Sequence, residues 1–221
     1  MYVALIGAVI QGDQQEILKN RKSLNEVLDQ MNRDYQSSLA VNLAMTTVAE
    51  FQGVFKKTED LFEIIDKIKF SLYPLEFRFG VGLGTIETAV KGRKVSDVDG
   101  PAFWHAQGAI TRVLEENASQ LSRILLSAGG DGSEFQLLND SLKLCDFVEN
   151  RWRDSQRELV KISLLANGHS DQILQSELAK ELGISRQAAN QRVQSSGIYQ
   201  FIRMKQSVSE TFTGIYRSLQ S

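Results

Sequence analysis

The segment SELAKELGISRQAANQRV, Ser176–Val193, decides the fold of the C-terminal part of the chain. Apolar and small residues recur at helical spacing on both sides of Gly183, which predicts two helices joined by a sharp corner. Ala179 is small enough for two helices to cross closely, and Gly183 can adopt the backbone conformation of a tight turn. Ile184 supplies an apolar plug, and Ser185 is a typical N-cap residue of the next helix. The segment therefore predicts a helix-turn-helix.

A helix-turn-helix places its second helix in the DNA major groove, with the N-terminal residues of that helix nearest the base edges. Amide and guanidinium groups at its outward positions suit adenine and guanine edges, whereas other basic side chains suit phosphates. A plain helical hairpin with solvated polar residues is the alternative interpretation. We expect a DNA-binding surface made of Lys180, Ser185, Arg186, Gln187, Asn190, Gln191 and Arg192.

The charge of the chain neither demands nor excludes a DNA partner. The formal net charge is −2, from 25 Lys and Arg against 27 Asp and Glu. Residues 170–221 hold six basic and four acidic side chains, which is a net charge of +2. The remaining 19 basic and 23 acidic side chains give residues 1–169 a net charge of −4. A local basic patch is sufficient for DNA affinity, because salt screens charges beyond about 8–10 Å.

Strands and helices alternate in the first part of the chain. The continuous apolar run Tyr2–Ile10 predicts a strand buried on both faces. A helix, two strands, a second helix and a further strand follow, and together with the first strand they make a βαββαβ core. Another helix and a short strand come after this core. We expect an antiparallel sheet with helices on one face, the ferredoxin-like α+β layout. The segments that give this order are helix 14–35, strand 39–47, strand 51–55, helix 59–73, strand 75–87, a helix from Gly100 and strand 121–127.

Glycines alternate along the predicted strand 75–87, at Gly80, Gly82 and Gly84, so all three share one face of the sheet. A close approach of something to the backbone explains such a pattern. Two explanations remain open, a bound ligand or a helix packed against a smooth sheet face.

From Ser133 onward only helices are predicted. The last of them, 197–219, carries an apolar stripe that either packs on its own domain or pairs with a second copy of the chain. We place a boundary near Asn150, between a domain of residues 1–150 and a helix-turn-helix domain of residues 151–221 with its C-terminal helix.

The composition bears on the class of protein and on its location in the cell. Hydrophobic residues are 42% and charged residues 24% of the chain, as in ordinary globular proteins. The single cysteine, Cys145, excludes an intramolecular disulfide and is expected to be buried and inert. The apolar start of the chain lacks a basic flank, so we expect neither a signal peptide nor a membrane span and a cytoplasmic location.

The motifs MYVALIG, AEFQG, FRFGVGLGTI and DGPAFWHAQGAI, followed by the helix-turn-helix, give the chain a likeness to a known family. In this order they resemble the SatD family of bacterial proteins over nearly the whole chain. More remotely, the layout resembles the palm domains of class III nucleotide cyclases and GGDEF-type cyclases. The resemblance implies a palm-like domain, in which cyclases bind two divalent metals through an aspartate after the first strand and another in the β-hairpin.

The chain departs from the cyclase pattern at both of these positions. Ala8 and Ala49 stand where the carboxylates are expected, and a methyl group cannot coordinate Mg²⁺. Strand alternation predicts that the neighbouring Glu50 points to the other face than position 49, unless the geometry of the turn brings it back. We therefore expect no metal, no cofactor and no catalytic residue, and we lean against an enzyme. A shallow site for a nucleotide or other small anion is still expected, at Glu50, Arg78, Gly82, Asp99 and Gly100.

Together these features predict a sequence-specific DNA-binding protein that binds double-stranded DNA and regulates transcription. It has a catalytically degenerate palm-like sensor or assembly domain and is a candidate homodimer without a membrane partner. The alternative is a metal-dependent nucleotide-binding or nucleotide-cyclising enzyme, or a carboxylate-substituted variant of one, that its helix-turn-helix directs to its target.

Overall fold

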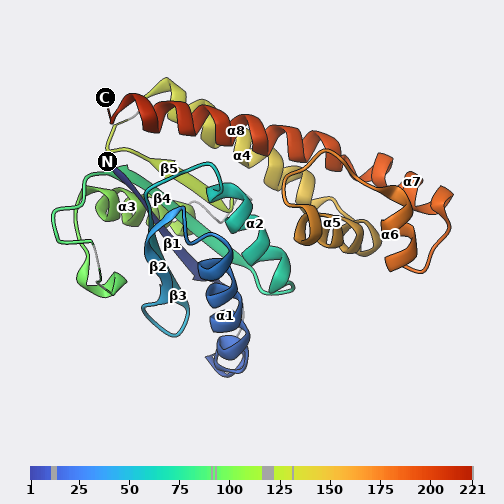
Figure 1. Ribbon diagram of the computed structural model, residues 1–221, viewed down its shortest axis with the longest axis horizontal. Coiled ribbons are helices and arrows are strands. Elements are labelled where there is room, and N and C mark those ends of the chain that lie inside the picture. Colours follow the sequence, from blue (N-terminus) through green and yellow to red (C-terminus); the bar gives the residue numbers. More distant parts are fainter. Residues whose placement is uncertain (11–13, 91, 93, 116–121, 131, 221) are drawn as a thin grey trace.

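The chain folds as a mixed α+β protein in which one sheet is followed by a run of helices (Figure 1). The computed structural model describes residues 1–10, 14–90, 92, 94–115, 122–130 and 132–220. The strands are β1 (Tyr2–Val9), β2 (Leu39–Met45), β3 (Glu50–Phe55), β4 (Phe77–Gly84) and β5 (Ile124–Ser127). The helices are α1 (Gln14–Asp34), α2 (Leu61–Ser71), the short 3-10 helix η1 (Val95–Asp97), α3 (Pro101–Glu115), α4 (Ser133–Asn150), α5 (Asp154–Asn167), α6 (Gln175–Glu181), α7 (Arg186–Ser196) and α8 (Ile198–Ser218).

The five strands form one sheet in the order β2-β3-β1-β4-β5. β1 lies at the centre, antiparallel to both β3 and β4, and β2 and β3 form a hairpin. β5 differs from the prediction of a wholly antiparallel sheet because it pairs in parallel with β4. The chain reaches this edge through α3, and a helical crossover returns the chain in the same direction as the strand before it.

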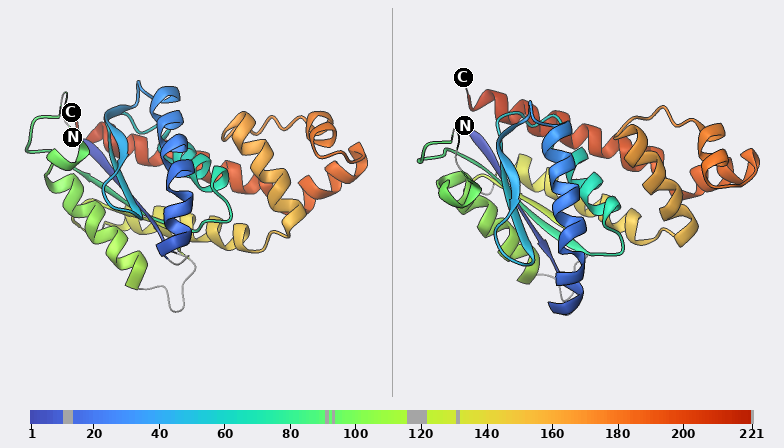
Figure 2. Two further views of the ribbon diagram at one scale, coloured as in Figure 1. Left: turned by 90° about the horizontal axis from the view of Figure 1, so that it is seen from below. Right: turned by 60° about the horizontal axis from the view of Figure 1, so that its bottom comes forward.

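Helices cover both faces of the sheet, so the prediction of helices on one face is wrong. On one face, α1 and α2 pack against Val3 and Leu5 of β1. On the other face, α3 packs against Ala4 and Ile6. Successive residues of a strand point to opposite faces, and the β1 run is apolar at both sets of positions. Each face must therefore be covered to exclude water, and helices lie on both sides of the sheet (Figure 2).

α3 packs directly against the glycines of β4. A Cβ atom on Gly82 would lie 2.0 Å from the carbonyl oxygen of Ala102, and one on Gly80 would lie 2.2 Å from that of Ala106. The absence of side chains on this face thus lets the helix backbone lie directly on the strand. Of the two explanations for the glycine pattern, helix packing is the one that the structure contains.

α8 extends from the α6–α7 end of the molecule to the sheet and belongs to two apolar clusters (Figure 1). Its first half packs with α5, α6 and α7 through residues such as Phe201 and Ile202. Its second half packs against α2 and the main core through Val208, Phe212 and Tyr216. The apolar stripe of this helix is therefore buried inside its own chain and does not offer these side chains to a second copy.

A buried ionic cluster joins α2, α4 and α8. The Lys205 ammonium is fully buried and lies 3.1 Å from Asp66, which also contacts Lys69 at 3.2 Å and His169 at 2.9 Å. Lys69 in turn lies 2.7 Å from Glu149. Burial by itself raises the pKa of Asp66, but the charges of Lys205 and Lys69 outweigh it and hold that pKa well below its usual range.

Candidate nucleic-acid interface

α6 and α7 are joined by a four-residue corner that matches the predicted turn. Gly183 has φ +63°, in the left-handed region that favours glycine, and the Ile184 N–H donates to the Ala179 carbonyl at 3.0 Å. Ser185 caps α7, because its hydroxyl oxygen accepts a hydrogen bond from the Ala188 N–H at 3.1 Å. The small residue, the glycine and the cap thus make the local contacts that their sequence positions require.

α7 has one buried and one exposed face. Ala189 and Val193 are fully buried, and Val193 belongs to the cluster formed with α5 and α8. The side chains predicted to contact DNA lie away from this face. Arg186, Gln187, Asn190 and Gln191 of α7 are exposed, as are Ser185 and Lys180, whereas Arg192 is half-buried.

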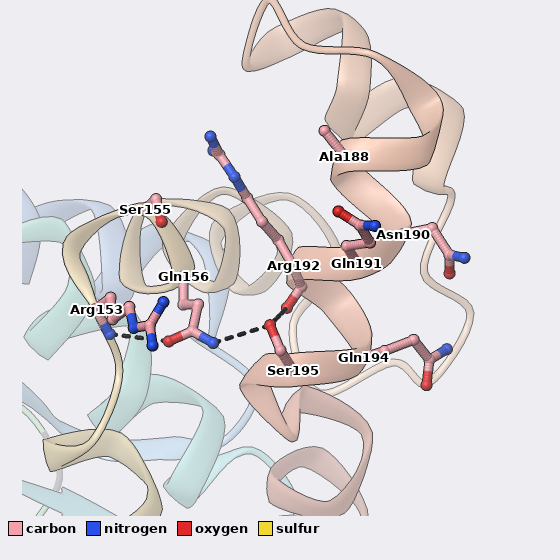
Figure 3. Close-up of a pocket in the computed structure, with 9 residues that line it drawn as sticks. All are labelled: Arg153, Ser155, Gln156, Ala188, Asn190, Gln191, Arg192, Gln194 and Ser195. Carbon is pink, nitrogen blue, oxygen red and sulfur yellow. Dashed lines mark hydrogen bonds between the residues drawn. The ribbon is translucent and has the colours of Figure 1, made fainter.

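A groove of about 640 Å³ lies between α7 and the start of α5 (Figure 3). Arg192 extends from α7 across its mouth toward α5, and Arg153 stands on the α5 side. Gln156 spans the groove, since its Nε2 donates to the Ser195 hydroxyl at 3.0 Å. The lining residues are Arg153, Ser155, Gln156, Ala188, Asn190, Gln191, Arg192, Gln194 and Ser195.

The groove is lined mainly by polar and positively charged side chains. It holds two guanidinium groups, several amides and hydroxyls, and no carboxylate among its nine lining residues. Such a set offers donors and positive charge, which suit phosphates and base edges. Sequence reasoning missed Arg153, Ser155 and Gln156, because only the fold brings the first turn of α5 next to α7.

The residues expected at a small-ligand site fall into two groups. In the sheet register, Ala8 of β1 is opposite both Glu50 of β3 and Arg78 of β4. Directly opposed residues point to the same face, so Glu50 lies on the face of Ala8. Ala49 packs against the core on the other face, so Glu50 points to the other face than position 49, as strand alternation predicts. β3 starts at Glu50 itself, and the Val9 N–H donates to the Ala49 carbonyl at 2.8 Å, which fixes this alignment.

Glu50 and Arg78 are engaged within the chain. The Glu50 carboxylate accepts hydrogen bonds from the Thr46 hydroxyl at 3.2 Å and the Gln52 amide at 2.9 Å. Arg78 is buried and donates to the Phe77 carbonyl at 3.1 Å. Burial and the nearby charge of Arg123 lower the pKa of Arg78.

The other expected ligand residues lie at the far end of β4. Asp99 accepts hydrogen bonds from the Gly100 N–H at 2.7 Å and the Trp104 indole at 3.0 Å, at the start of α3. Gly84 contacts this helix start and is six residues from Arg78, about 20 Å along a strand. Gly82, between them, is covered by α3. The structure therefore does not bring the five residues into one site.

Within the described part of the chain, no group of three or more His, Cys, Asp or Glu side chains is arranged to hold a metal ion. Cys145 is buried, and burial raises the pKa of its thiol to about 11. No helix among the described residues is long and apolar enough to cross a bilayer.

The fold and this surface define a class of protein: an α+β sheet domain joined to a bundle of helices with an exposed polar helix at its tip. The SatD family model matches residues 2–212, and the chain belongs to this family. No curated protein and no solved structure matches the chain.

Proposed function

We propose that this protein binds double-stranded DNA in a sequence-specific manner and regulates transcription. In this proposal, residues 176–193 act as a helix-turn-helix, and α7 enters the major groove. The observation that carries the proposal is the exposed polar face of α7 beside a groove with two arginines and no carboxylate. A solvated helical hairpin has no need of such a one-sided distribution of charge.

Each side chain of this surface has a proposed partner on the duplex. Arg186 and Gln187, in the first turn of α7, suit guanine and adenine edges, and Asn190 and Gln191 extend the same face by one turn. Lys180 and Arg192 flank this face and suit phosphates. The half-buried position of Arg192 fits a phosphate clamp, because its aliphatic stem packs while its guanidinium reaches outward.

We further propose that residues 1–150 form a palm-like domain of the ferredoxin-like type. The order β2-β3-β1-β4 and the βαββαβ connection support it, with β5 as an added edge strand. The methyl groups of Ala8 and Ala49 argue against two-metal catalysis at the usual place. Of the two roles, sensing and assembly, assembly fits better, because the expected ligand residues are split between two ends of β4.

The experiment is a selection of binding fragments from sheared bacterial DNA by the full chain, followed by footprinting of the recovered fragments. The proposal expects one recurring site, protected in the major groove. Arg186→Ala is expected to lose the site, whereas Arg203→Ala, an exposed arginine on α8, serves as the matched control and is expected to retain it. Recovery of random fragments with equal efficiency by both variants would overturn sequence-specific binding.

A further inference from the structure

α4 carries a row of large apolar side chains that its own chain leaves partly uncovered, although the Arg151 guanidinium lies 3.4 Å over the ring of Phe147. Leu137 is 67% exposed, Leu144 is 52% exposed and Phe147 is 44% exposed. The opposite side of the same helix is buried, with Leu138, Leu142 and Cys145 in the core. Scattered exposed apolar residues are ordinary, but a row of three on one helix face is a typical sign of an interaction surface.

The exposed row follows the seven-residue pattern of paired helices. Leu137, Asp140, Leu144, Phe147 and Arg151 are separated by three, four, three and four residues. All five are exposed, and residues at this spacing lie along one side of a helix. Ser133, four residues before Leu137, continues the same spacing. We call these six residues the α4 seam.

The α4 seam is self-complementary when two copies run antiparallel. A twofold axis at position 142 places Leu137 of one copy against Phe147 of the other, and Asp140 against Leu144. The same axis places Ser133 against Arg151. Apolar side chains then cover one another in the Leu137–Phe147 layer, which occurs once on each side of the axis, as the symmetry of a twofold interface requires.

The charged residues in and beside the α4 seam select this direction. Glu134 and Asp140 lie in the N-terminal half of the helix, whereas Lys143 and Arg151 lie in the C-terminal half. In the antiparallel arrangement, Glu134 of one copy is next to Arg151 of the other, and Asp140 is next to Lys143. In a parallel pair, Asp140 would face Asp140 and Arg151 would face Arg151, which places like charges together.

We propose that the protein forms a homodimer through an antiparallel α4–α4 contact. A hollow of about 600 Å³ begins at Phe147 and Arg151 and continues to Gln194 and Gly197 at the end of α7. The N-terminal end of the second copy's α4 lies over this hollow, so the interface extends to the base of the proposed DNA-reading helix. The relation of the dimer to a twofold DNA site rests on the proposed function, but the dimer itself is tested without DNA.

The first test measures the dimer dissociation constant by sedimentation equilibrium of the full chain. Leu144→Asp is expected to raise this constant by about tenfold or more, because it places a charge opposite Asp140 of the partner copy. The control Leu114→Asp changes a leucine of similar exposure on α3 and is expected to leave the constant unchanged. A chain that is monomeric at about 100 µM would overturn the proposal, because the proposed dimer requires a dissociation constant below that concentration.

The second test is a charge exchange. Glu134→Arg and Arg151→Glu are each expected to weaken the dimer by about fivefold, because each single change opposes two like charges. The double variant restores the opposite pairing between copies and is expected to return to within about twofold of the original constant. A double variant weaker than either single variant would exclude the proposed register.

The third test distinguishes antiparallel from parallel pairing. Chains with Ser133→Cys and chains with Arg151→Cys are mixed and oxidised, with buried Cys145 left in place. The proposal expects mixed 133–151 disulfides and no 133–133 disulfides, because the two positions 133 are 18 residues apart along the pair, about 27 Å. Preferential 133–133 cross-linking would overturn the antiparallel arrangement. Equal cross-linking of all combinations would overturn a specific contact.

Discussion

The buried ion pair between Lys205 and Asp66 provides a quantitative test of how the helical region is attached to the sheet domain. Lys205→Met removes a fully buried ammonium from α8 and leaves an apolar side chain of similar length in its place. Breaking a buried pair costs about 3–5 kcal/mol, because the remaining charge stays buried. Asp66 retains Lys69 at 3.2 Å and His169 at 2.9 Å. We therefore expect the lower end of that range, about 3 kcal/mol.

The assay is urea unfolding at neutral pH, monitored by far-UV circular dichroism, with Arg217→Ala as the control. Arg217 forms an ion pair with Glu59 at 2.6 Å, but both side chains are largely exposed, so its loss is expected to cost less than about 1 kcal/mol. The double variant Lys205→Met with Asp66→Asn removes both charges and is expected to recover part of the loss. A cost for Lys205→Met no larger than that for Arg217→Ala would refute the view that this cluster joins the two regions.

Three other predictions concern the sheet and its surroundings. Burial raises the pKa of Asp146 from 3.8 to about 6, so the folded state retains a proton that the unfolded state releases, and stability is lost as the pH rises from about 4 to 6. Asp146→Asn is expected to remove this loss of unfolding free energy, which reaches about 3 kcal/mol at pH 7. Urea unfolding at several pH values measures it. Gly82→Ala is expected to cost about 3 kcal/mol or to prevent folding, because its methyl group would overlap the Ala102 carbonyl. Asn139 accepts a hydrogen bond from the Leu126 N–H at 2.8 Å and donates to its carbonyl at 3.0 Å, which blocks the β5 edge. Asn139→Ala is therefore expected to increase aggregation, measured by light scattering.

Each of these three has a contradicting result. An Asp146→Asn variant whose stability changes with pH in parallel with the original chain would exclude the buried carboxyl as the source. A Gly82→Ala variant of unchanged stability would mean that α3 does not lie on β4 as described. An Asn139→Ala variant that stays monodisperse on heating would show that the edge is protected by other means.

Local sequence patterns were sufficient for much of the fold. The apolar run of β1 indicated burial on both faces, and the structure provides helices on both. The same pattern, followed through, argues against the prediction of helices on one face. Gly183 and Ser185 determined the corner between α6 and α7, because turn and cap chemistry act over three or four residues.

Interactions between distant residues were not predictable in this way. Asp66 and Lys205 are 139 residues apart in the chain, and neither is unusual in its own helix. The α5 side of the groove was missed for the same reason. Strand alternation gave the face of Glu50 relative to Ala49, but its place opposite Ala8 was not predictable, because the register of β3 against β1 joins residues that are far apart in the chain.

The most direct test of the account is the affinity of the full chain for the selected duplex and for a scrambled duplex of equal length, at several salt concentrations. We expect at least about 100-fold preference for the selected duplex, reduced about tenfold or more by Arg186→Ala as one base contact is lost. Lys180→Ala is expected to weaken binding to both duplexes equally and to lower the salt dependence by about one charge. Equal affinity for the two duplexes, or no binding at low salt, would contradict the proposal that α7 reads DNA.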